Sequence, residues 1–297
     1  MWPFRRKSGT SGKADKGEAA KSSRRLFGRE YTAGVPYALP SDLSEMNRLD
    51  FQHFILRQAF KGNYAAPVRN PYRILDVGTG TGRWAKEVAM LFPAASVTGL
   101  DIKEQVAESQ GSDLSPANYS FVSGNILEGL PFPDASFDFV HQRLLFFAIP
   151  SDRWQFLLNE LARVTRPGGW VEVVEGRYGY EPMGPAAQHI SDVMLATMIQ
   201  RGIDPRASAH LDQFLRNAGL QQVQTRTIKL PVGDWGGRLG QLAVTDVMTF
   251  SQAAKPLLLA QGMTESECAA LIAEMRNECE TMRYTWPFYI VYGQRPG

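Results

Sequence analysis

Short apolar runs alternate with segments of helical periodicity between residues 72 and 177. Strands are predicted at 72–77, 96–101, 121–124, 137–141 and 170–175. Helices are predicted between them at 83–92 and 154–165, and Pro167, Gly168 and Gly169 end the second helix. Strands that alternate with helices in this order favour a parallel sheet with helices on both faces.

The chain on either side of this core is predicted to be mostly helical. Upstream, residues 41–60 carry apolar side chains such as Leu49 at helical spacing. Ser41 or Asp42 is the expected N-cap of this helix, and Gly62 is its expected end. Downstream, the predicted helices are 189–201, 209–218, 240–260 and 264–283, and the predicted strands are 223–230 and 288–292.

Composition and charge narrow the class of protein. The 297 residues are 44% hydrophobic and 21% charged, which is typical of a globular protein. The net charge of +2 is unevenly distributed, because residues 1–30 carry nine Lys or Arg and three acids. We expect a disordered basic arm over 1–30 and a mildly acidic body. Specific nucleic-acid binding is not expected, because it requires positive charge on the folded surface.

Two further features bear on location and on metals. No apolar run approaches the roughly 18 residues of a membrane span, and the N-terminus lacks the apolar segment of a signal peptide. Cys268 and Cys279 have no metal-ligand pattern around them. We therefore expect a cytoplasmic protein without a membrane span or a metal.

The strongest chemical signal is a glycine-rich turn between the first predicted strand and the helix that follows. It contains Gly78, Gly80 and Gly82. Glycines let the backbone turn sharply and approach a ligand closely, and the helix offers free N–H groups at its start. Asp101 closes the second predicted strand, where a carboxylate can accept hydrogen bonds from ribose hydroxyls. Together these features predict an adenosine-type nucleoside at the carboxyl ends of parallel strands.

The spacing of the glycines bears on which nucleoside cofactor binds. The dinucleotide fingerprint is G-x-G-x-x-G, whereas this chain has G-x-G-x-G preceded by Asp76. An acid at that position suits a ligand with an ammonium group better than it suits a pyrophosphate. S-adenosylmethionine is therefore favoured over NAD, and an NAD-dependent enzyme is kept as the weaker alternative.

These motifs resemble those of the class I S-adenosylmethionine-dependent methyltransferases. The matching segments are 75–82, 99–102, 124–138 and 161–169, in the family's order and at its spacing. Residues 34–40 and 47–53 are similar to a subgroup from fungal secondary metabolism, which includes global-regulator-type members, and to bacterial relatives. The resemblance covers 72–177 closely and the rest more loosely.

The resemblance implies a Rossmann-like α/β sheet of seven strands, mostly parallel, with the last strand antiparallel. A single methyltransferase domain would span 31–297. Within it, 31–71 would form an N-terminal helical cap and 72–177 the cofactor-binding core. The segments 178–207 and 231–286 would be helical insertions that form a lid over the substrate.

Residue roles follow from the same resemblance. Gly78, Thr79 and Gly80 would line the methionine part of the cofactor, Asp76 its ammonium end and Asp101 its ribose. Asn125 stands where the family often has Asp, and would still meet the adenine edge. The full implied cofactor set is Tyr37, Arg48, Asp76, Gly78, Thr79, Gly80, Asp101, Ile102, Asn125, Ile126, Gln142 and Arg143. Arg48 is the candidate for the cofactor carboxylate, since arginine binds carboxylates bidentately.

No catalytic group is assigned, and the candidates are His53, His141 and Arg143. The candidates for substrate binding are Arg177, Tyr178, Tyr180, His189, Trp235 and Trp286. A purely structural role is the alternative for each histidine and tryptophan. The segment from Arg177 to Tyr180 follows the fifth predicted strand, at the edge where open α/β sheets bind ligands.

The expected function is methyl transfer by in-line displacement to a small-molecule acceptor. Oxygen of an aromatic or carboxylic metabolite is favoured, and nitrogen or sulfur is possible. The segment after residue 141 lacks the Asn-Pro-Pro-Tyr motif of adenine and glutamine-amide methyltransferases. The alternative is a regulatory protein of the same fold that acts through protein partners or on a protein substrate. A homodimer is left open.

Overall fold

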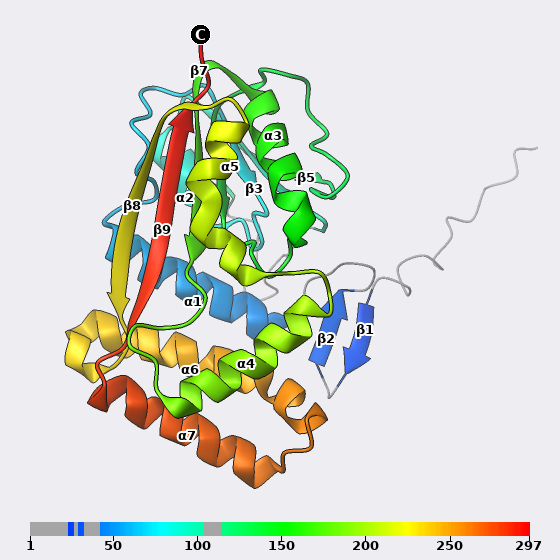
Figure 1. The fold of residues 1–297 in the computed structure, drawn as a ribbon. Coiled ribbons are helices and arrows are strands. Elements are labelled where there is room, and N and C mark those ends of the chain that lie inside the picture. The colour runs from blue at the N-terminus through cyan, green and yellow to red at the C-terminus, as the bar shows by residue number, and fades with distance from the viewer. Residues whose placement is uncertain (1–22, 27–28, 33–41, 104–114) are drawn as a thin grey trace, which may run out of the picture.

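The computed structural model of the chain describes residues 23–26, 29–32, 42–103 and 115–297 (Figure 1). The described chain forms a seven-stranded sheet with the strand order β5-β4-β3-β6-β7-β9-β8. Its strands are β3 (Arg73–Val77), β4 (Ser96–Asp101), β5 (Tyr119–Ser123), β6 (Phe137–Arg143), β7 (Thr165–Gly176), β8 (Gln221–Pro231) and β9 (Thr285–Gln294).

Strand directions confirm the predicted topology. The strands β5, β4, β3, β6 and β7 run parallel to their neighbours, whereas β9 is antiparallel to both β7 and β8. Val77 at the end of β3 is in register with Leu100 on one side and Gln142 on the other. The carboxyl ends of β4, β3 and β6 therefore meet at one edge, beside the turn that contains Gly78.

Two helical layers cover the sheet. Helix α2 (Arg83–Leu91) packs on one face, with Trp84 and Val88 against Ile74 and Phe139. Helices α3 (Trp154–Val164) and α5 (Leu211–Asn217) pack on the other face, where Trp154 and Leu215 join the main core. Each helix buries its apolar face on the sheet, as expected for an α/β fold.

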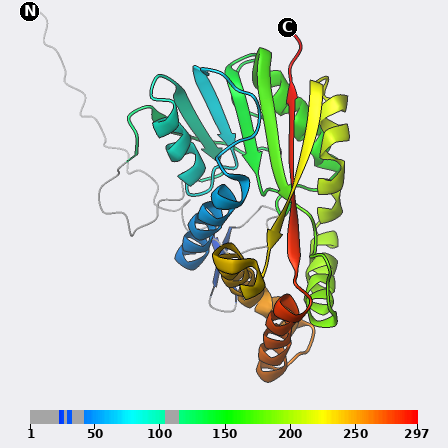
Figure 2. The same cartoon turned by 90° about the vertical axis from the view of Figure 1, so that its left-hand side faces the viewer.

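Four more helices form a cap at the carboxyl end of the parallel strands. They are α1 (Leu43–Phe60), α4 (Pro185–Ile199), α6 (Gly237–Ala260) and α7 (Glu265–Thr281). They lie below the sheet in Figure 1 and again in Figure 2, a quarter turn away. The cap has its own apolar core, which includes Ile55, Ile190, Val244 and Met275. The carboxyl ends of the parallel strands thus face the cap, whose apolar core is separate from the core of the sheet.

The cap helices begin and end near the predicted residues. Asp42 caps α1, where its carboxylate accepts a hydrogen bond of 3.2 Å from the amide of Glu45. Lys61, rather than Gly62, adopts the left-handed conformation that ends this helix. Helix α4 begins at Pro185, four residues before its predicted start, since proline suits the first turn of a helix.

The N-terminal segment contains two short strands. Strands β1 (Ser23–Leu26) and β2 (Arg29–Thr32) pair antiparallel, and β1 and the first two residues of β2 fall within the basic arm predicted over 1–30. Residues 1–22 lie outside the described part of the chain. So does Tyr37, a predicted cofactor residue. Within the described ranges, no helix is both long and apolar enough to cross a bilayer.

Candidate functional site

The glycine-rich turn folds back over the end of β4. Gly78 and Gly80 both adopt positive φ angles, of 70° and 55°. The amides of Gly78 and Thr79 donate to the carbonyl of Leu100 at 2.8 and 3.0 Å. A Cβ on Gly78 would lie 2.5 Å from the side chain of Leu145, so the position has no room for a side chain. The sharp turn predicted from the glycines is therefore present.

Asp101 is held at the end of β4 by backbone amides. Its Oδ2 accepts a hydrogen bond of 2.8 Å from Gly80, and its Oδ1 accepts one of 2.7 Å from Ile102. Burial raises the pKa of Asp101, and these two amides oppose the rise. Each carboxylate oxygen has a second lone pair, so Asp101 can accept further hydrogen bonds in a fixed orientation.

A second acid of the turn holds a histidine. Asp76 accepts a hydrogen bond of 2.7 Å from the hydroxyl of Thr79 through Oδ2, and its Oδ1 lies 2.9 Å from Nδ1 of His141. The His141 ring stacks on Trp84 at 3.7 Å between centroids, with 4° between the ring planes. Burial lowers the pKa of His141. The imidazole of His141 is thus neutral, with Asp76 at its edge and Trp84 against its face.

Arg143 begins a chain of polar contacts toward the surface. Its guanidinium donates to Nδ1 of His53 at 2.9 Å, and Nε2 of His53 lies 3.1 Å from the carboxylate of Glu87. Arg57 also donates to Glu87, at 2.8 Å. Burial, reinforced by Arg143, lowers the pKa of His53 to about 4. His53 is therefore neutral, and its Nδ1 accepts from Arg143, so this catalytic candidate has no nitrogen free to take a proton.

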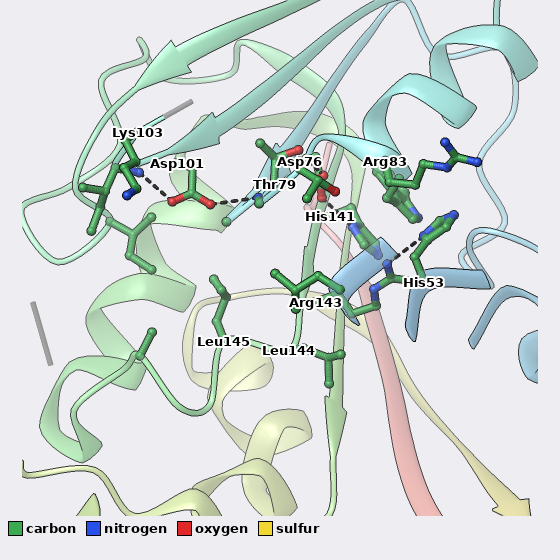
Figure 3. Close-up of a pocket in the computed structure, with 18 of the residues that line it drawn as sticks. His53, Asp76, Thr79, Arg83, Asp101, Lys103, His141, Arg143, Leu144 and Leu145 are labelled. Carbon is green, nitrogen blue, oxygen red and sulfur yellow. Dashed lines mark hydrogen bonds and ion pairs between the residues drawn. The ribbon is translucent and has the colours of Figure 1, made fainter. Parts of the chain in front are cut away.

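These groups line one cavity at the carboxyl edge of the sheet (Figure 3). It encloses about 1360 Å³ of empty space, its open mouth included. Figure 3 shows Asp101 and Lys103 toward one end and His141, Arg143 and His53 toward the other. Nine residues of the predicted cofactor set line it: Asp76, Gly78, Thr79, Gly80, Asp101, Ile102, Asn125, Ile126 and Arg143.

Two predicted cofactor residues lie elsewhere. Gln142 is fully buried and donates to the carboxylate of Glu175 at 2.8 Å, because its side chain alternates to the far side of β6. Arg48 lines a neighbouring cavity, where Glu45 and Asp246 bind its guanidinium at 2.6 and 3.1 Å. Both assignments are corrected, and Arg143 is the half-buried arginine of the first cavity.

The neighbouring cavity lies between the cap and the sheet. It shares Leu49, Gln52 and Leu144 with the first cavity. Its other walls come from α4, α6, α7, the loop after β6 and the loop after β7. Of the predicted substrate-binding residues, it contains Arg177, Tyr178, Tyr180 and Trp286. The two cavities therefore adjoin along one wall.

Two predicted substrate-binding residues fall outside this cavity. His189 lines a separate hollow on the outer side of α4. Trp235 is 38% exposed, and its indole N–H donates to the carbonyl of Val232 at 3.1 Å. Both predictions relied on residue type alone, and the fold directs these side chains away from the sheet edge.

Several residues that line the second cavity belong to no recognisable sequence motif. They include Phe147, Met194, Asp246, Phe250, Ser251 and Met275. Asp246 is buried on α6, where it accepts hydrogen bonds of 3.1 Å from Arg48 and 3.0 Å from Gln52. Burial raises its pKa, whereas Arg48 lowers it. An acid in the middle of an apolar helix is the only sequence signal that could have singled out Asp246.

Glu175 on β7 organises the loop between the cavities. Its Oε1 accepts hydrogen bonds of 2.8 Å from the amide of Leu145 and from Gln142. Its Oε2 lies 3.4 Å from the amide of Phe146. Leu144 precedes these amides in the left-handed conformation and contributes to both cavities. Glu175 therefore holds the loop that forms the shared wall.

No cluster of three or more possible metal-ligating side chains occurs in the described ranges. The remaining chemistry of the first cavity is that of three acids, two neutral histidines and three cations around a glycine turn: Glu45, Asp76, Asp101, His53, His141, Arg83, Lys103 and Arg143. Such a set can bind a ligand that carries hydroxyls, an ammonium group and a carboxylate.

Comparison with known proteins finds similarity to methyltransferases. The family described as "Methyltransferase domain" matches residues 74–169. N-methyltransferase sirN of Leptosphaeria maculans is 30% identical over 88% of this chain and 95% of its own. Methyltransferase str2 of Strobilurus tenacellus is 28% identical over 86% of this chain and 94% of its own.

A solved structure shares the fold. Phosphoethanolamine N-methyltransferase 2 of Haemonchus contortus, in complex with S-adenosyl-L-methionine, has a TM-score of 0.50 and 16% identity. The match covers 90% of this chain and 62% of that protein, so this chain spans less than two thirds of it.

Proposed function

Because this chain belongs to the class I S-adenosylmethionine-dependent methyltransferases, we propose that it methylates a small, largely apolar molecule bound between the cap and the sheet. The observation that carries the proposal is the wall shared by the two cavities. Leu49, Gln52 and Leu144 face both of them. A molecule in the second cavity is therefore a direct neighbour of a molecule in the first.

The first cavity fits the cofactor of the family. Gly78 and Gly80 turn the backbone sharply at positive φ and carry no side chain, which lets a ligand approach the backbone of the turn closely. Asp101 presents a fixed carboxylate for the ribose hydroxyls, and Asn125 and Ile126 lie on the same side for the base. Arg143 offers a guanidinium for the carboxylate at the other end. When bound, S-adenosylmethionine supplies a methyl group on a positively charged sulfur.

Asn125 holds its side chain by local contacts. Its carbonyl oxygen accepts a hydrogen bond of 3.1 Å from the amide of Leu127, and its amide donates to Glu128 at 2.7 Å. The carbonyl oxygen retains a second lone pair. Asn125 can therefore still accept a hydrogen bond from an adenine amino group, as the resemblance implies.

The second cavity contributes position and the exclusion of water. Phe147, Phe250 and Met275 give it apolar walls that favour an apolar or aromatic acceptor. Burial raises the pKa of Tyr178 and of Tyr180, so both hydroxyls keep their protons. The Tyr178 hydroxyl donates to the carbonyl of Ser191. Holding the reacting atoms in line supplies much of the rate enhancement in such a reaction.

We propose nitrogen as the accepting atom. Glu45 and Asp246 place two carboxylates around the single guanidinium of Arg48, and Asp246 lines the acceptor cavity. A hydrogen-bond acceptor in an apolar wall suits a ligand that carries a donor, either N–H or O–H. The similarity to N-methyltransferase sirN supports nitrogen between these two. The preference for oxygen, drawn from sequence alone, stays a prediction that the same experiment tests.

The test is transfer of an isotope-labelled methyl group from S-adenosylmethionine to matched sets of aromatic amines, phenols and carboxylic acids. Mass spectrometry of the products identifies the labelled atom. We expect turnover with amines of suitable shape. Turnover only with phenols or acids would overturn the choice of nitrogen. Label found only on protein would support the partner-directed alternative instead.

A further inference from the structure

His141 lies near the end of β6 and is 1% exposed. Its Nδ1 is 2.9 Å from Oδ1 of Asp76. The other carboxylate oxygen of Asp76 accepts a hydrogen bond of 2.7 Å from the hydroxyl of Thr79. Because a carboxylate only accepts hydrogen bonds, Nδ1 carries the ring proton.

The opposite nitrogen of the ring is left as an acceptor. Burial lowers the pKa of His141, so the ring is neutral and Nε2 bears a lone pair. Within the described part of the chain, no group donates to this buried atom. A buried acceptor without a donor is unfavourable, because folding has removed its hydrogen bond to water. Stacking on Trp84 and the contact with Asp76 hold the ring in this orientation.

The position of His141 limits which ligand group can meet it. His141 lines the same cavity as Gly78 and Thr79. Its strand is separated from β4 by β3, so it lies about 10 Å from the strand that carries Asp101. Figure 3 likewise places Asp101 and His141 toward different ends of the cavity. Asp101 and Asn125 mark the adenosine end, so His141 marks the amino-acid end.

We propose that Nε2 of His141 accepts a hydrogen bond from the ammonium group of the methionine part of the cofactor. Of the donors on S-adenosylmethionine, the ribose hydroxyls and the adenine amino group belong to the other end. Asp76 supports this contact through the histidine, because its Oδ1 holds the Nδ1 proton and so leaves Nε2 as the acceptor. The inference depends on the cofactor of the family and is independent of the acceptor proposed above.

The test compares two ligands that differ only at the ammonium group. One is S-adenosylhomocysteine, and the other is its analogue with hydrogen in place of that group. Calorimetry on the full chain measures both affinities for the unmodified protein and for His141→Ala. We expect His141→Ala to lower the affinity for S-adenosylhomocysteine about tenfold, since one buried hydrogen bond is lost. The affinity for the analogue should fall less than about twofold. An equal loss of affinity for both ligands would mean that His141 has a purely structural role, and would overturn the proposal.

His189→Ala is the matched control, since this histidine lies on the outer side of α4 and in a different hollow. It should change neither affinity. If His141→Ala does not fold, nitrogen NMR of the unmodified protein decides. Adding S-adenosylhomocysteine should shift the Nε2 resonance of His141 toward the hydrogen-bonded value, whereas the analogue should not. The same shift with both ligands would contradict the proposal, and so would no shift with either.

Discussion

The cofactor side and the cap side of the site are built in different ways. On the cofactor side, backbone amides hold the acid that closes β4. Asp101 is held by Gly80, 21 residues away, and by its own neighbour Ile102. On the cap side, side chains hold one another across the chain: Arg48 binds Asp246 from 198 residues away. The shared chemistry therefore sits on a compact motif, whereas acceptor recognition depends on how distant helices meet.

The largest expected effect is a loss of stability from a substitution in the cap. Asp246→Ala removes the acceptor for both Arg48 and Gln52 in a buried site. Arg48 keeps its ion pair with Glu45, but one of its donors and the amide of Gln52 lose a buried acceptor, at about 1–3 kcal/mol each. We therefore expect the free energy of unfolding to fall by about 2–6 kcal/mol. Urea denaturation measures it. Asp246→Asn is the matched control, since it keeps the volume and one acceptor, and it should lose less. A loss below about 1 kcal/mol for the alanine variant would show that the cap does not depend on this contact.

The second prediction concerns the cofactor side alone. Asp101→Ala removes the fixed carboxylate expected to hold the ribose hydroxyls. Affinity for S-adenosylhomocysteine should fall by about 1–3 kcal/mol, the cost of unpaired buried donors. Calorimetry measures the affinity, and the same titration with NAD checks the cofactor. Unchanged affinity would remove Asp101 from the site, and heat with NAD alone would overturn the cofactor assignment.

The contrast between the two sides explains what could be predicted from sequence. The parallel strands and the turn at Gly78 could be predicted because their signals are local: strand periodicity, glycines with positive φ, and an acid at the end of the next strand. Nine residues of the implied cofactor set line the first cavity for this reason. The C-terminal helices also appeared in the sequence, since their periodicity is equally local.

Of the residues that line the second cavity, the sequence singled out Arg177, Tyr178, Tyr180 and Trp286. The others could not be predicted in the same way. Arg48 was assigned to the cofactor because its chemistry suits a carboxylate, yet Asp246 and Glu45 hold it in the other cavity. Asp246, Phe250 and Met275 meet only because α1, α4, α6 and α7 pack together. Residue type suggested His189 and Trp235, but the direction of each side chain depends on that packing and directs both outward.

The third prediction tests whether a substitution in the second cavity leaves the cofactor affinity of the first cavity unchanged. Phe250 lines the acceptor cavity and packs against Phe147, with 5.6 Å between ring centroids. Phe250→Ala removes apolar contact worth about 1.5–3 kcal/mol when fully buried, and this side chain is half-buried. We expect KM for an acceptor to rise roughly tenfold, while the affinity for S-adenosylhomocysteine stays within twofold. Steady-state kinetics and calorimetry measure the two. A parallel loss of both would mean that the cavities act as one site.

The fourth prediction tests the loop that forms the wall between the two cavities. Burial raises the pKa of Glu175 from an ordinary 4.5 to about 8. Between these values the folded protein keeps a proton that the unfolded chain has released, so stability falls as the pH rises through this window. Glu175→Gln has no such proton. Its Tm relative to the unmodified protein should therefore rise by several degrees from pH 5 to pH 8 and then level off, as calorimetric unfolding at a series of pH values would show. Glu175→Ala should be less stable at every pH, because the amide of Leu145 loses its acceptor. A Tm difference for Glu175→Gln that does not change with pH would mean that the loop is held by a permanently charged carboxylate.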